Sequence, residues 1–295
     1  MKLIAVSLIS LLHFQDSGPW RVVFERDGKL WSIREDGSDC REEPGNVLRR
    51  AVASPDGKRL TSVSTKDGDA EIWVSDIDGK NLLKLTDNSA MDSFPDWTPD
   101  SKRITFTSNR TGKPQIWIME ADGTNPTRLT DHPNGARESR ISPRGDCMSY
   151  IEILPARESV KVSTLRMSDL SGRDAKVLIE NEQIDDHAWS PKGDQLAVRL
   201  GQELRILETA TVKTIWSITL ADKVPWKVAN THTCGLNWRP DGGAIAYTFR
   251  FAKGGCVDHP DGTYLDVLTI VNRKEGRRIY PFKNWESAVF VRWIR

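Results

Sequence analysis

Short runs of alternating apolar and polar residues, separated by Gly, Pro and Asp, recur along the chain at a nearly fixed interval. Residues 103–107 (Arg-Ile-Thr-Phe-Thr) alternate with the period of two that is typical of a half-buried strand, and 115–118 (Gln-Ile-Trp-Ile) form the next run. Two similar runs lie 44 residues earlier, at 59–63 and 71–74. This repetition predicts an all-β protein assembled from similar units.

Five of the repeats contain a turn that begins with proline. Residues 54–58 (Ser-Pro-Asp-Gly-Lys) correspond to 98–102 (Thr-Pro-Asp-Ser-Lys), and Asp-Gly and Leu-Thr pairs follow at the same spacing in both repeats. Proline presets φ at the first turn position, and Asp-Gly tolerates the positive φ of a tight hairpin. A period of roughly 40 to 45 residues with several strands per repeat is typical of a β-propeller. Equivalent turns begin at Pro55, Pro99, Pro143, Pro191 and Pro240.

Each repeat divides into four antiparallel strands, A to D. Strand A ends at the Trp before the proline turn, B alternates, C carries Ile-Trp, and D ends in Leu-Thr. Residues 20–37 supply strands B, C and D of a sixth repeat, and 289–293 match a strand A. We therefore predict a six-bladed β-propeller of four-stranded antiparallel blades, closed by a C-terminal strand that joins the N-terminal blade.

The chain start differs in composition from the repeats. Lys2 precedes an apolar run over 3–12, which is too short for the ~20 residues that span a bilayer. We expect a signal peptide over 1–17, one propeller domain over 18–295, no membrane span, and a periplasmic or secreted protein.

Charge and aromatic content narrow the choice of partners. Lys and Arg number 42 against 41 Asp and Glu, so no basic field points to nucleic acid, and we expect no nucleic-acid partner. The 11 Trp mostly occupy repeat-equivalent positions, such as Trp73 and Trp117, and are predicted to pack between blades. We expect the chain to act as a monomer.

The Ser-Pro-Asp-Gly-Lys, Ile-Trp, Asp-Gly and Leu-Thr elements resemble the repeats of TolB-type β-propellers, which are related to the propeller caps of prolyl oligopeptidase-like enzymes. The resemblance covers nearly the whole chain after about Gly18. TolB joins an N-terminal α/β domain to its propeller and binds partner proteins at the channel mouth. The resemblance implies a propeller that lacks this first domain and presents its mouth to a protein or peptide partner.

The longer connections should gather at that mouth. Insertions at 154–160 and 251–264, with the D–A connections 130–137 and 223–232, share one face of the predicted fold. Trp226 lies outside the repeat pattern and is the expected partner anchor, because Trp dominates interface energetics. The candidate binding residues are Trp226, His232, Arg137, His132, His187, Asp186 and His259.

An enzyme remains the alternative. No Gly-x-Ser-x-Gly motif occurs, which argues against a serine hydrolase. His187, His232 and neighbouring Asp residues leave open a metal-dependent enzyme at the channel mouth, of the polysaccharide lyase or hydrolase type. Polar channel lining explains the same residues, so we favour a non-enzymatic scaffold and expect no catalytic residue, metal or cofactor.

The state of the four cysteines bears on the cellular compartment of the protein and on the order of its repeats. Cys234 and Cys256 belong to the same repeat near the predicted mouth, and we expect them to form a disulfide. Cys40 and Cys147 lie in different repeats and are expected to be thiols. A fully reduced protein stays an alternative, because the spacing matches no disulfide framework.

Overall fold

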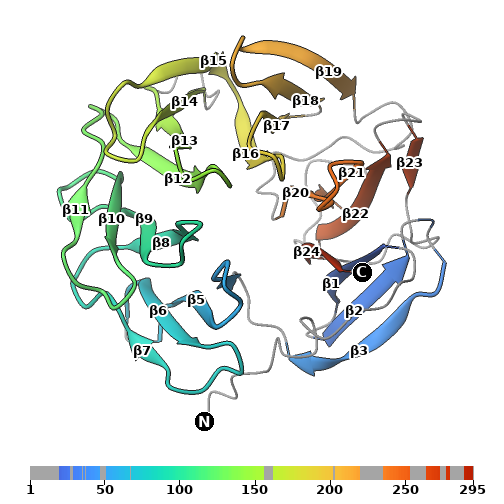
Figure 1. Cartoon of the computed structure of the whole chain (residues 1–295), viewed down its shortest axis with the longest axis horizontal. Helices are drawn as coiled ribbons and strands as arrows, with labels where there is room; N and C mark the ends of the chain where they lie inside the picture. Colours follow the sequence, from blue (N-terminus) through green and yellow to red (C-terminus); the bar gives the residue numbers. More distant parts are fainter. Residues whose placement is uncertain are drawn as a thin grey trace. The chain divides into compact units, whose positions relative to one another are not determined.

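The computed structural model describes residues 20–26, 29–34, 36, 38–46, 51–66, 68–155, 162–201, 203–219, 235–252, 264–272, 277–279 and 289–294. Within these residues, 24 strands form six four-stranded antiparallel sheets (Figure 1). The chain divides into two compact units. Unit 1 contains Leu48–Ile184, and unit 2 contains Ser10–Val47 and Asp185–Arg295. Each unit holds three of the sheets.

Unit 1 contains the sheets β4–β7, β8–β11 and β12–β15, each a meander in which consecutive strands pair. The innermost strands β8 and β12 contact each other, and β7, β11 and β15 are the outer strands of their sheets (Figure 1). The strand bounds are β4 (Val52–Ala53), β5 (Arg59–Ser64), β6 (Glu71–Asp76), β7 (Leu83–Lys84), β8 (Asp92–Trp97), β9 (Arg103–Ser108), β10 (Gln115–Glu120), β11 (Thr127–Arg128), β12 (Ala136–Ile141), β13 (Cys147–Ile153), β14 (Ser163–Asp169) and β15 (Lys176–Glu182).

Unit 2 contains the sheets β16–β19, β20–β23 and β24-β1-β2-β3. In the last of these, β24 pairs antiparallel with β1, and Trp293 lies opposite Val22. The first and last of the described strands therefore share a sheet. The strand bounds are β1 (Arg21–Arg26), β2 (Lys29–Arg34), β3 (Arg41–Asn46), β16 (Ile184–Trp189), β17 (Gln195–Leu200), β18 (Glu203–Glu208), β19 (Lys213–Thr219), β20 (Asn237–Trp238), β21 (Ala244–Ala252), β22 (Tyr264–Asn272), β23 (Arg277–Ile279) and β24 (Val289–Ile294).

The proline turns have the conformation that their sequence predicts. The Ser54 hydroxyl donates to Asp56 Oδ1 at 2.6 Å, and the same carboxylate accepts the Lys58 N–H at 3.1 Å. The third turn position has a positive φ in all five turns, which explains why four of them carry glycine there. These residues are Gly57 (70°), Ser101 (60°), Gly145 (73°), Gly193 (66°) and Gly242 (76°).

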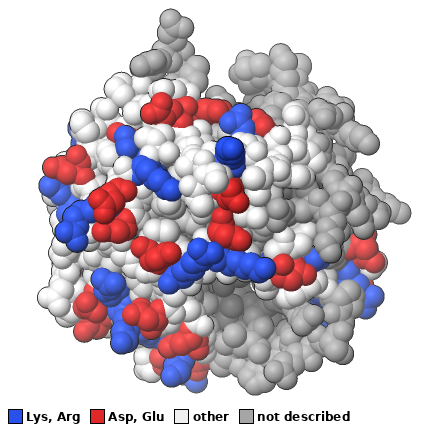
Figure 2. Space-filling view, turned by 45° about the horizontal axis from the view of Figure 1, so that its top comes forward, with Lys and Arg blue, Asp and Glu red and all other residues white. Residues whose placement is uncertain are grey.

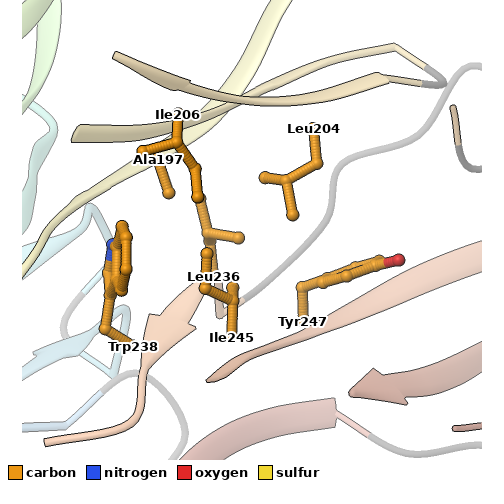
Figure 3. Packing of buried hydrophobic residues seen from close by; sticks show 7 residues of the cluster. All are labelled: Ala197, Leu204, Ile206, Leu236, Trp238, Ile245 and Tyr247. Carbon is orange, nitrogen blue, oxygen red and sulfur yellow. The ribbon is translucent and has the colours of Figure 1, made fainter. Parts of the chain in front are cut away.

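The hydrophobic core of each unit lies between neighbouring sheets. In unit 1, Trp97 of β8 is buried against Ile72 and Val74 of β6, which confirms its predicted packing role. In unit 2, side chains of β17 and β18 pack against those of β20 and β21 (Figure 3). That cluster comprises Ala197, Leu204, Ile206, Leu236, Trp238, Ile245 and Tyr247.

The two short D strands of unit 1 end before the Leu-Thr pair, and not at it as predicted. β7 ends at Lys84 and β11 at Arg128. The threonine side chain explains the difference, because the Thr86 hydroxyl accepts the N–H of Ile72 at 2.9 Å. A side chain thus takes the place of a backbone acceptor at the end of the strand.

Candidate functional site

One end of unit 1 gathers its D–A and B–C connections, because successive antiparallel strands reverse direction. We call the segments 87–91, 109–114 and 131–135 the D–A end. The A–B and C–D turns lie at the opposite end, which we call the turn end, and include 54–57, 77–81, 98–101 and 121–125.

Side-chain hydrogen bonds fix the first D–A loop. Asn88 donates its backbone N–H to Glu71 Oε1 at 2.8 Å and its amide to Asp92 Oδ2 at 2.9 Å. The Asn88 amide oxygen accepts the Ala90 N–H at 2.7 Å. Arg110 completes the arrangement by pairing with Asp92 at 2.8 Å. Because these bonds restrain both ends of the loop, its conformation is preformed.

Met91 is the exposed apolar residue of this loop. The residue is 60% exposed, although Ala90 and Asp92 on either side are buried. The Met91 N–H donates to Asn109 Oδ1 in the B–C turn at 2.8 Å. Sequence reasoning missed this residue, because a single Met in a polar loop belongs to no repeat element.

The second D–A loop is held by Gln115. Its amide oxygen accepts the His132 N–H at 3.2 Å and the Thr130 hydroxyl at 2.8 Å. Its amide nitrogen donates to the His132 carbonyl at 2.8 Å. The Lys113 ammonium donates to the carbonyl of Pro133, which ties the B–C turn to the same loop.

The His132 side chain, a predicted binding residue, lies between a carboxylate and a phenol. Its Nδ1 is 3.0 Å from Glu152 Oε1, and its Nε2 is 3.2 Å from the Tyr150 hydroxyl. Arg166 donates to the other Glu152 oxygen at 2.5 Å. Burial raises the pKa of Tyr150, and this residue is only 1% exposed. The order carboxylate, imidazole and hydroxyl matches that of a catalytic triad, but the buried hydroxyl is inaccessible to a substrate. The group therefore holds the loop in place.

Arg137, a second predicted binding residue, lies on the innermost strand β12 beside a backbone bulge. Glu138 has a φ of 56°, and the register of β12 against β13 shifts at this point. The equivalent residue of β8, Phe94, has a φ of 52°. Such bulges re-aim side chains. The Arg137 guanidinium pairs with the Glu138 carboxylate and donates to the Ile184 carbonyl at 3.3 Å.

Asp186 and His187 lie in the interior of unit 2. Asp186 accepts the N–H of His187 at 2.8 Å and the N–H of Leu236 at 2.9 Å, so it links β16 to the residue that directly precedes β20. His187 is fully buried. Nearby, Asp185 pairs with Arg199 at 2.9 Å, and burial lowers the pKa of that arginine.

The remaining predicted residues, Trp226, His232 and His259, lie outside the described residues, as does the expected Cys234–Cys256 bridge. In the described part of the chain, no group of three or more His, Cys, Asp and Glu side chains is placed to hold a metal ion. No helix among the described residues is long and apolar enough to cross a membrane. Lys and Arg side chains are interspersed with Asp and Glu over the described surface in Figure 2.

Residues 44–197, just over half of the sequence, match the family described as the TolB beta propeller domain. The chain belongs to this family. The fold is accordingly an all-β propeller with four-stranded antiparallel blades, and the TolB resemblance of the repeats is confirmed.

Two solved structures share the fold of this TolB-family chain. TolB from Acinetobacter baumannii is 17% identical, with a TM-score of 0.65 over 93% of this chain and 66% of that chain. The family member described here thus spans about two thirds of that TolB. A chain from a nidogen/laminin complex is 10% identical, with a TM-score of 0.63 over 94% of this chain and 98% of that chain. No curated protein matches the sequence.

Proposed function

We propose that the chain is a non-enzymatic scaffold that binds a protein or peptide partner at its D–A end. The observation that carries this proposal is the preformed state of the two D–A loops, which Asn88 and Gln115 restrain through side-chain hydrogen bonds. A rigid surface binds without first being ordered, which lowers the cost of association. Binding and catalytic residues are concentrated on such loops of a fixed scaffold.

The proposed scaffold is a closed ring of six four-stranded blades. The three similar sheets in each unit and the pairing of β24 with β1 support this arrangement. In such a ring, the innermost strands β8 and β12 line the central channel, and the D–A end of unit 1 forms part of the rim of one mouth. Arg137 and His132 then belong to the wall and rim of that mouth, with Trp226, His232 and His259 on neighbouring loops.

We further propose that the chain is exported, with 1–17 as its signal peptide, and acts as a monomer in the periplasm or outside the cell. The short apolar run over 3–12 supports export. N-terminal sequencing of the exported protein tests this part, and a protein that retains Met1 contradicts it.

A comparison of exposed charge reversals tests where the partner binds. Asp87 and Asp131 at the D–A end are 86% and 77% exposed in their side chains, so D87K/D131K changes the surface and leaves the core intact. Lys80 and Lys102 are exposed at the turn end, and K80E/K102E provides a change of equal size there.

The chain and both variants are cross-linked to neighbouring proteins in the native source and purified. We expect one partner to be recovered with the unmodified chain and with K80E/K102E, and lost with D87K/D131K. Equal recovery with all three proteins, or loss with K80E/K102E alone, contradicts binding at the D–A end.

A further inference from the structure

Met91, Asn109 and Lys113 form a row across the D–A end of unit 1, and the strand pairing beside them fixes their order. Asp92 pairs with Ser108 in the β8–β9 ladder, and Ser108 pairs with Gln115 in the β9–β10 ladder. Met91 directly precedes the first of these residues. Asn109 directly follows the second, and Lys113 lies two residues before the third. The row Met91, Asn109 and Lys113 therefore crosses the end of one sheet.

Met91 is the apolar member of this row. The other large hydrophobic residues exposed in the described part of the chain, Leu82, Leu83 and Ile215, lie on or beside the outer strands β7 and β19. A single exposed apolar side chain is common on protein surfaces. Met91 differs because its backbone N–H is bound to Asn109 and its neighbours are buried. A fixed backbone with a flexible thioether suits binding to an apolar side chain.

Lys113 is the charged member of the row. It is exposed, and its ammonium donates to the carbonyl of Pro133; no carboxylate among the described residues pairs with it. Arg110, in the same D–A segment, pairs with Asp92, and the neighbouring Arg128 and Arg137 pair with Asp131 and Glu138. Lys113 therefore contributes an uncompensated positive charge beside an apolar contact.

We propose that Met91 and Lys113 form the anchoring pair for an extended segment of a partner protein. The segment places an apolar side chain against Met91 and a carboxylate, from Asp, Glu or a chain terminus, against Lys113. This inference rests on the proposed function, because it requires the D–A end to be the binding face. Charge complementarity sets the sign of the partner residue, and the rigid Met91 backbone sets the position of its apolar neighbour.

The probe is a library of random linear peptides displayed on phage, selected on the full chain. Selection is repeated on M91S, K113E and K102E, the last being a matched charge reversal at the turn end. The substituted side chains are all exposed, and unchanged thermal transitions of the variants verify that they fold.

We expect peptides selected on the unmodified chain and on K102E to share an apolar residue close to an acidic residue. K113E is expected to select basic residues at the acidic position, and M91S to weaken binding of the original peptides by roughly tenfold. Unchanged preference and affinity in both variants overturn the inference, as does the failure to select any peptide.

The result also separates this inference from the proposed function. Peptides that fail to bind D87K/D131K, but bind M91S and K113E as well as the unmodified chain, contradict the anchoring pair and leave the D–A end as the binding face. Peptides that lose binding only to K80E/K102E contradict both the anchoring pair and the proposed binding face.

Discussion

The indole Nε1 of Trp97 in β8 donates to the carbonyl of Val52 in β4, 3.0 Å away in the neighbouring sheet. The same contact recurs in unit 2, where Trp238 donates to Ala188 at 2.9 Å. The Trp at the end of strand A thus joins adjacent blades by a hydrogen bond as well as by apolar contact. Trp97→Ala is expected to lower the free energy of unfolding by about 3 to 5 kcal/mol, the range for truncating a buried aromatic.

Trp97→Phe separates the two contributions. It retains an aromatic ring and removes the indole donor, while the Val52 carbonyl still accepts the Thr61 hydroxyl at 3.2 Å. The lost hydrogen bond is expected to cost about 0.5 to 1.5 kcal/mol. Urea denaturation of both variants gives the measurement, and equal losses would show that the hydrogen bond, and not burial, holds the sheets together.

Gly172 marks a close approach of two sheets in unit 1. A Cβ at this position would lie 1.9 Å from the Leu129 carbonyl oxygen, and its φ of 79° disfavours L side chains. Gly172→Ala should therefore destabilise unit 1 through both a clash and strain. Gly112 is the matched control, because its φ is 94° and nothing lies within 4 Å of the added Cβ. A drop in melting temperature as small for Gly172→Ala as for Gly112→Ala would contradict this contact.

The proline turns predict a loss of stability in acid. The Ser54 hydroxyl and the Lys58 N–H lower the pKa of Asp56, and Thr98 and Lys102 do the same for Asp100. The folded-state pKa lies below the unfolded value of about 3.9. These carboxylates therefore stabilise the fold above that pH, and their contribution is lost as the pH falls through the folded-state pKa.

The double variant D56N/D100N tests this effect. Its free energy of unfolding should fall less than that of the unmodified chain between pH 7 and pH 3, because two carboxylates that gain protons on acid unfolding are gone. Parallel pH profiles for the two proteins would show that these turn residues contribute nothing to acid sensitivity.

The cysteines are expected to differ in reactivity. Burial raises the pKa of Cys147 to about 11, whereas Cys40 is exposed. Since the thiolate is the nucleophile, iodoacetamide at pH 8 should modify Cys40 of the folded chain faster than Cys147. Thiol counting on denatured, unreduced exported protein should give two groups if Cys234 and Cys256 are bridged. A count of four contradicts the bridge and weakens the case for export.

Much of the fold was predictable because the turn residues and the apolar alternation that define each strand lie close together in the sequence. The turn at 54–58 combines a preset φ, a capping carboxylate and a glycine, and the alternation over 103–107 defines a strand without reference to the rest of the chain. The ends of the D strands were not predictable. That the Thr86 hydroxyl, and not a backbone carbonyl, accepts the Ile72 N–H depends on three-dimensional geometry that the sequence pattern does not contain.

The site was harder to predict because its contacts join distant parts of the chain. Loop position singled out His132, but pairing of its ring with Glu152 and Tyr150 depends on how the loop meets β13. Asp186 was predicted as a binding residue from its place in the repeat, and the pattern did not show that both of its oxygens accept buried N–H groups. Met91 follows no pattern at all. Polar residues near a predicted mouth can equally be structural, and only the contacts decide.

Hydrogen exchange of the chain, alone and with its captured partner, tests the central claim most directly. Binding at the D–A end predicts slower exchange in 87–91, 109–114 and 131–135 when the partner is bound, with unchanged exchange in the turn-end segments 77–81 and 121–125. Protection that appears at the turn end, or on the outer strands β7 and β11, and spares the D–A end would contradict the account.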